Sequence, residues 1–164
     1  MQNLQDVFFL QTNGSGVLSF AGVSASAGQV IQVLSATDST TRTTTSSSYV
    51  TGSNTLSVTI TPSSASNKIL IMLFTMTARD DGATANFTIY KGASNLFGAD
   101  GIFIKGREDD AGTDPIPLGF HYLDSPATTS ATTYQVYMKI AGSVTAYLNN
   151  GSTKASITVM EIKG

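Results

Sequence analysis

The sequence has no cysteine, and only 12% of its 164 residues are charged. Without cysteine, neither disulfides nor thiolate metal sites can hold the fold together. The net charge of −2 gives no electrostatic basis for binding nucleic acid or an anionic membrane surface. No apolar run approaches the roughly 20 residues that span a bilayer, and the N-terminus lacks the basic and apolar regions of a secretion signal. We therefore expect no nucleic-acid partner and no membrane insertion.

Helical signals are scarce as well. No apolar stripe recurs at i, i+3, i+4 and i+7, and the long side chains that favour helices are few. Serine and threonine make up about a quarter of the chain. Threonine suits the pleated surface of a strand, whereas serine favours turns. A β-surface coated with hydroxyl groups stays soluble without many charges, and such surfaces suit secreted or virion proteins.

Apolar and polar residues alternate in several segments, which predicts strands with one wet face. The clearest segments are residues 55–62, 86–92 and 133–142, and Pro62 ends the first of them. Their apolar positions are Leu56, Val58, Ile60, Phe87, Ile89, Tyr134, Val136, Met138 and Ile140. Turn-forming residues separate about eight to ten such strands, a spacing that fits an antiparallel β-sandwich or a jelly roll.

Two segments are apolar on both faces, residues 68–78 and residues 155–162. A single sandwich gives each strand one buried and one exposed face. Residues 68–78 are therefore expected to form a central strand, covered on one side by a second sheet. The second apolar face of both segments predicts burial by neighbouring subunits.

Both ends of the chain resemble a known family. The segment TNGSGVLSFAG, residues 12–22, resembles a connector repeated in bacteriophage tail-fibre proteins, where it leads into a terminal head domain. Residues 30–71 are similar to the opening of such head domains, with a strand, a Thr/Ser-rich segment, LSVTITPSS and then SNKILI. The closing ASITVMEIKG resembles their final strand. These pieces cover about half of the chain.

The resemblance implies a homotrimeric β-sandwich head, similar in outline to tumour-necrosis-factor or C1q-type jelly rolls, at the distal end of a fibre. The expected fold is thus all-β, an antiparallel β-sandwich of jelly-roll type that is homotrimeric. Residues 28–164 would form the head domain and residues 1–27 a short N-terminal anchoring arm.

The arm contains two short apolar segments that are too small to form a core. In a trimer, three copies could bundle around the axis or add strands to other virion proteins. The alternative is an arm that is disordered or docked locally. The residues expected to anchor the arm are Val7, Phe8, Phe9, Leu10, Val17, Leu18 and Phe20.

The function expected from these features is that of a non-enzymatic phage virion structural protein, assembled in the host cytoplasm. It would be a short tail fibre or fibre head that binds a glycan or protein of the host surface. The alternative is a capsid or baseplate decoration protein, or a head fibre, that stabilises the particle.

Residues 97–117 form the least regular stretch and are expected to be a long loop outside the sheets. Such loops often carry function. Aromatic rings beside Asp and Asn side chains are typical of carbohydrate sites. The alternative is that these rings pack beneath their own loops. The candidate receptor-binding residues are Asn95, Phe97, Asp100, Phe103, Tyr147, Asn149 and Asn150.

Catalysis and metal binding find little support in the sequence. The single histidine, His121, alternates with Phe120 and Tyr122 in a strand pattern, and no nucleophile elbow accompanies it. The acidic stretch REDDAGTD, residues 107–114, lacks the spacing of a helix-loop-helix calcium site. It is expected to be a solvated loop, in which Arg107 could pair locally. We expect no enzyme, no cofactor and no metal.

Overall fold

A computed structural model describes residues 8–12, 15, 18–22, 25–80, 83–105, 115–141, 144–151 and 153–164. These residues contain no helix, and their strands form antiparallel sheets. The expectation of an all-β antiparallel sandwich is therefore confirmed. The strands are β1 (Phe8–Thr12), β2 (Leu18–Gly22), β3 (Val30–Asp38), β4 (Arg42–Thr44), β5 (Val50–Thr51), β6 (Ser57–Ile60), β7 (Lys68–Arg79), β8 (Thr84–Lys91), β9 (Ser94–Asn95), β10 (Ile102–Lys105), β11 (Ile116–Asp124), β12 (Thr132–Ala141), β13 (Ala146–Leu148) and β14 (Ala155–Ile162).

The first large sheet, called the β7 sheet here, is organised around β7. One edge of β7 pairs with β11 over nearly its whole length. The other edge pairs first with β14 and then with β13. Outside these lie β3, paired with β14, and β4, paired with β13. The expectation that residues 68–78 form a central strand is confirmed.

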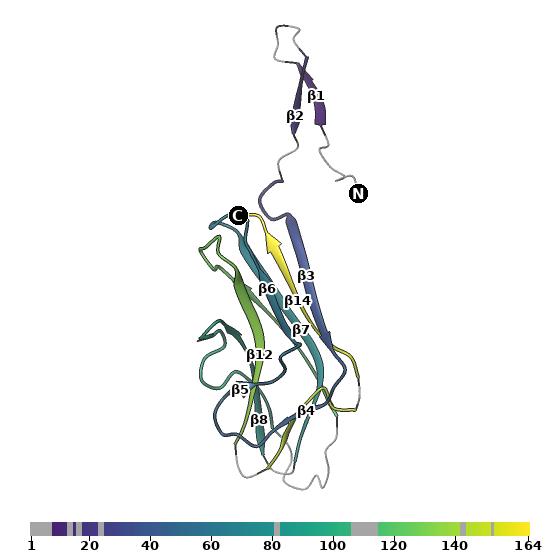
Figure 1. Cartoon of the computed structure of the whole chain (residues 1–164), viewed down its shortest axis with the longest axis vertical. Coiled ribbons are helices and arrows are strands. Elements are labelled where there is room, and N and C mark those ends of the chain that lie inside the picture. Colours follow the sequence, from purple (N-terminus) through teal and green to yellow (C-terminus); the bar gives the residue numbers. More distant parts are fainter. Residues whose placement is uncertain are drawn as a thin grey trace.

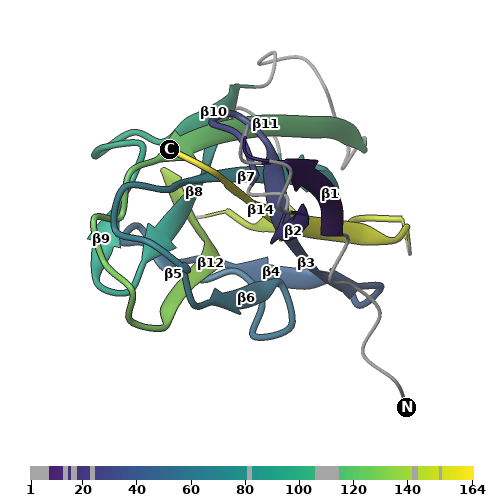
Figure 2. The same cartoon turned by 90° about the horizontal axis from the view of Figure 1, so that it is seen from above.

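The second large sheet, called the β12 sheet, is organised around β12 and β8. These two strands pair along eight positions. The far edge of β8 carries β9 and β10, and the far edge of β12 carries β5 and β6. Figure 2 looks down the long axis and shows the strands of the two sheets facing one another.

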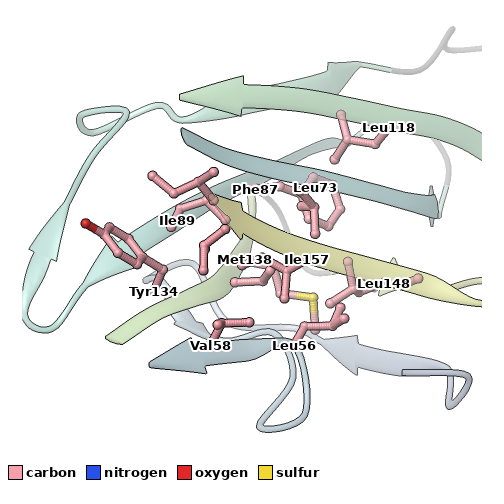
Figure 3. Close-up of a cluster of buried hydrophobic side chains, with 14 of the residues drawn as sticks. Leu56, Val58, Leu73, Phe87, Ile89, Leu118, Tyr134, Met138, Leu148 and Ile157 are labelled. Carbon is pink, nitrogen blue, oxygen red and sulfur yellow. The ribbon is translucent and has the colours of Figure 1, made fainter. Parts of the chain in front are cut away.

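The core fills the space between the two sheets, as Figure 3 shows. Strand alternation places it there: every second residue of β7, β12 and β14 points inward and is buried. All the apolar positions expected from the three alternating segments are buried, from Leu56 to Ile140. Full burial of side chains such as Phe87 and Ile157 supplies about 1.5–3 kcal/mol each, which makes this interface the main source of stability.

Strands β1 and β2 form a hairpin that stands beyond one end of the sandwich, the end at which the chain terminates (Figure 1). Its register pairs Leu10 with Phe20 and Phe8 with Gly22. Strand β7 runs from this end of the sandwich to the opposite end. A lone two-stranded hairpin is at best marginally stable in water, so the projecting hairpin is expected to gain stability from a partner.

Candidate functional site

The outer face of the β7 sheet is rich in exposed apolar side chains. In one row across the sheet, the register aligns Val33, Met160, Leu70 and Leu123. Val33 is 53% exposed and Leu123 is 48% exposed. We call this surface the apolar face. Its members are Val30, Val33, Leu70, Met72, Phe74, Leu123, Met160 and Ile162.

Phe74 lies near the middle of β7 on the apolar face, and its ring is 55% exposed. Scattered exposed hydrophobic residues are ordinary, but contiguous apolar patches on soluble proteins usually mark contact surfaces. Around Phe74 the register places Ser156 and Gly119, and in the next row Thr158 and His121 flank Met72. On the strands that flank β7, the apolar face therefore carries no Asp, Glu, Lys or Arg side chain, and charged residues are depleted in the same way at the core of protein contact surfaces.

The outer face of the β12 sheet has a different chemistry. Tyr90 and Tyr137 stack with ring centroids 4.1 Å apart, and Tyr49 meets Tyr90 edge-on at 6.1 Å. The Lys139 ammonium lies 4.6 Å from the centre of the Tyr49 ring. We call these four residues the tyrosine cluster. The cluster was not predicted from the sequence, although Tyr90 and Tyr137 occupy positions on the solvent-facing side of their strands, which was the available signal.

The loop after β9 lies over this outer face and is held by side chains of the sheet. Asn86 donates to the Asp100 carbonyl at 2.7 Å, and Thr88 donates to the Asn95 side chain at 2.5 Å. Lys139 donates to the Ala99 carbonyl at 2.7 Å. Asn86 and Thr88 are consequently buried, although their alternation predicted a wet face.

Gly101 allows this loop to lie so close to the sheet. Its φ is +59°, and a Cβ there would collide with the Phe87 carbonyl oxygen and the Tyr49 hydroxyl. The Tyr49 hydroxyl is buried under Gly101 and has no hydrogen-bond partner in the described chain. Burial raises the pKa of Tyr49 to about 12, and Tyr90 and Asp100 add to the rise.

Four of the candidate receptor-binding residues lie together along this loop and the edge of the β12 sheet. Asn95 and Asp100 support the loop through the bonds just described, and Phe103 is 58% exposed on the outer face. Phe97 instead packs edge-on against Phe120 and Tyr122, at 5.0 and 5.2 Å between ring centroids. Because those two rings lie on the inward side of β11, Phe97 closes one side of the sandwich.

The other three candidates lie on the opposite sheet, at and after β13. The Tyr147 hydroxyl donates to the Asp80 carboxylate at 3.2 Å, and the Asn150 amide donates to the Met76 carbonyl at 3.0 Å. Asn149 is fully buried at φ +59°, and its side-chain amide donates to the Asp38 carbonyl at 2.9 Å. Asn149 thus shapes the turn, and the seven candidates form two separate groups.

Five of the seven residues expected to anchor the arm lie in strands that the structure describes. Phe8, Phe9 and Leu10 lie in β1, and Leu18 and Phe20 lie in β2. Val7 and Val17 lie outside the described residues. The pairing of the two apolar segments with each other was not predicted from the sequence.

His121 lies in β11, as its alternation predicted, and is exposed on the apolar face. Within the described residues, no group of three or more His, Cys, Asp or Glu side chains could hold a metal ion. The acidic stretch at residues 107–114 lies outside them. The described part of the chain also has no helix of the length and apolar character needed to cross a membrane.

Three buried carboxylates, Asp124, Asp38 and Glu161, tie parts of the sandwich together. Asp124 of β11 accepts a hydrogen bond from the Tyr134 hydroxyl at 2.6 Å and pairs with the Lys91 ammonium at 2.9 Å. Because Lys91 and Tyr134 belong to the β12 sheet, this cluster joins the two sheets. Burial, then the bond to Asp124, raises the pKa of Tyr134 far above its ordinary value.

Asp38, at the end of β3, receives hydrogen bonds from Ser53 at 2.5 Å and from the Thr40 amide at 2.9 Å. Arg42 also pairs with it at 3.1 Å. Burial raises the pKa of Asp38, but these bonds outweigh burial and hold its pKa well below the ordinary value. The carboxylate fixes the path of the chain from β3 into β4 and β5.

Glu161 of β14 is 2% exposed and faces the connection between β6 and β7. Its carboxylate accepts hydrogen bonds from the Ser63 amide at 2.6 Å, the Ser63 hydroxyl at 2.8 Å and the Asn67 side chain at 2.6 Å. Asn67 in turn accepts a bond from the Gly164 amide at 3.1 Å. Burial raises the pKa of Glu161, but these bonds outweigh it and keep the pKa below its ordinary value.

The Glu161 cluster predicts a loss of stability in acid. A carboxyl whose pKa is lower in the folded than in the unfolded chain stabilises the fold above its unfolded pKa, about 4.3, and this stabilisation disappears as pH falls through the folded pKa. Glu161→Gln is expected to cost about 1–3 kcal/mol at pH 7 and to make stability less pH-dependent below pH 4. Urea unfolding at a series of pH values measures both effects. An unchanged acid dependence in the variant would contradict this assignment.

The chain matches no family model and no curated protein.

Proposed function

We propose that the chain is a non-enzymatic structural protein of a bacteriophage virion, a homotrimeric short tail fibre or fibre head that binds the host cell surface. The observation that carries the proposal is the apolar face. Val33, Leu70 and Phe74 lie on the outer face of a sheet, and no other part of the described chain buries them. In an assembly around a threefold axis, each copy would bury the same surface of its neighbour. The resemblance of both chain ends to tail-fibre heads supports the choice of three copies and of a virion.

The jelly-roll part of the proposal is supported by the strand order. Apart from the short strands β4, β5, β9 and β13, the chain passes through β3, β6, β7 and β8 in the order β7 sheet, β12 sheet, β7 sheet, β12 sheet. It continues through β10, β11, β12 and β14 in the order β12 sheet, β7 sheet, β12 sheet, β7 sheet. These eight strands form two sets of four neighbours, β3–β14–β7–β11 and β6–β12–β8–β10, which is the number of strands in a jelly roll.

The arrangement of the ends supports attachment through the N-terminal arm. The β1–β2 hairpin extends beyond one end of the sandwich (Figure 1), and its apolar sequence would be covered by its copies or by other virion proteins. The opposite end then faces away from the particle and towards the host. Three weak contacts on one head, with several heads per virion, raise avidity by a factor of about 10² or more.

The proposal is tested by incubating the labelled full-length chain with a panel of bacterial strains and measuring bound fluorescence against protein concentration. Saturable binding to particular strains, competed by unlabelled protein, is the expected result. Absence of cell binding together with tight binding to purified phage capsids would overturn host attachment and favour particle decoration.

A further inference from the structure

Arg79, the last residue of β7, is a buried cation without an anionic partner among the residues that the structure describes. Its side chain points inward and is 5% exposed. Nε has no hydrogen-bond partner in the described chain, and the one bond of the guanidinium runs from Nη1 to the Asp80 carbonyl at 3.4 Å. The residue opposite Arg79 in the ladder, Ala146, offers no side-chain acceptor.

The other buried charged side chains of the described residues are all satisfied. Asp38 and Asp124 each have a cation and further donors, and Glu161 accepts three hydrogen bonds. Neither of the ion pairs in this part of the chain includes Arg79. Burying a charge without a partner costs several kcal/mol, so Arg79 stands apart as a group that calls for a functional explanation.

The adjacent carboxylate does not supply that partner. The Asp80 side chain accepts hydrogen bonds from the Thr145 amide at 2.9 Å and from the Tyr147 hydroxyl at 3.2 Å. Its pKa is lowered, chiefly by the bond from the Thr145 backbone. Asp80 is thus occupied with holding β13, and its charge opposes the approach of a multiply charged anion to Arg79.

We propose that Arg79 binds the carboxylate of an acidic sugar. A guanidinium is always charged, and its planar fork matches a carboxylate in bidentate geometry. A monoanion fits better than a phosphate because of Asp80 and the net charge of −2. The hairpin lies beyond the end of the sandwich at which β7 begins (Figure 1), so Arg79, the last residue of β7, lies at the opposite end. The inference that the sugar belongs to a host glycan rests on the proposed function. The inference that Arg79 binds a carboxylate does not depend on it.

The test uses the full-length chain and galacturonate, a sugar with a single carboxylate, with neutral galactose as the comparison. Wild type is expected to bind galacturonate in calorimetry and to show no binding of galactose, and Arg79→Met is expected to bind galacturonate at least tenfold more weakly. Lys154→Gln is the matched control, because it removes one positive charge from an exposed position at the same end. The control is expected to retain wild-type affinity.

A measurement on wild type alone protects the test against misfolding of the variant. In two-dimensional NMR, the Arg79 Nε–H resonance is expected to shift on titration with galacturonate and not with galactose. No shift, or equal affinities of wild type and Arg79→Met, would overturn the proposal, and an equal response to acetate would overturn its restriction to sugars. Host attachment can fail in the strain panel while carboxylate binding persists. Conversely, unimpaired cell binding by a folded Arg79→Met would overturn a glycan role and leave host attachment standing.

Discussion

Asp124→Ala is expected to lower the free energy of unfolding by about 3 kcal/mol. The substitution leaves the Tyr134 hydroxyl, which is fully buried, without its acceptor. It also removes the only carboxylate paired with Lys91 in the described chain. Because the cluster joins the two sheets, its loss affects the interface that contains the core. Urea unfolding followed by circular dichroism, at one fixed protein concentration, measures the change.

The matched variant replaces the whole cluster instead of one member. Asp124→Leu combined with Lys91→Met and Tyr134→Phe removes the buried charge and its partners together, and replacing such a cluster by apolar groups is often close to neutral. The triple variant is therefore expected to be more stable than Asp124→Ala. If Asp124→Ala costs less than about 1 kcal/mol, the cluster is not the link between the sheets that its geometry indicates.

Local patterns in the sequence were sufficient to predict the core. The alternation of residues 133–142 follows directly from the geometry of a strand, so it identified the buried side of β12 without knowledge of its neighbours. The central position of β7 in its sheet was also predicted from the sequence, because a strand that is apolar on both faces is not expected at a solvent-exposed sheet edge. These predictions depend on a period of two residues, which any neighbouring strand must respect.

Features created by distant contacts were not predicted. Thr88 alternates as a wet-face residue, yet it is buried because the loop after β9 folds back over it. Phe97 was a candidate for ligand contact, with packing beneath its own loop as the alternative, and the approach of β11 gives it two aromatic neighbours that the sequence did not indicate. The pairing of β1 with β2 was also not predicted, although the two strands are close in the sequence, because neither short segment specifies its partner.

The two outer faces separate two roles within one sandwich. The apolar face has the composition of a contact between protein chains, whereas the outer face of the β12 sheet carries the tyrosine cluster and is partly covered by the loop after β9. Host contact through loops requires that assembly leaves those loops free. An assembly through the apolar face satisfies this requirement, because that face lies along the strands and not at the end that carries Arg79.

Leu70→Glu and Phe74→Glu are each expected to convert the assembled protein into single chains. Both side chains lie on the apolar face and point away from the core, so the fold of one chain should survive. A carboxylate buried between copies without a partner costs several kcal/mol at every contact. Native mass spectrometry at micromolar concentration is expected to give three chains for wild type and one for either variant.

The matched control is Thr59→Glu, which adds the same charge at an exposed position of the β12 sheet. It is expected to remain trimeric, and far-ultraviolet circular dichroism should show that all three variants keep their strands. A wild-type mass of one chain would contradict the trimer directly. Trimeric Leu70→Glu and Phe74→Glu alongside trimeric wild type would show that copies meet through another surface, because two unpaired carboxylates near the centre of β7 cannot be accommodated in a packed interface.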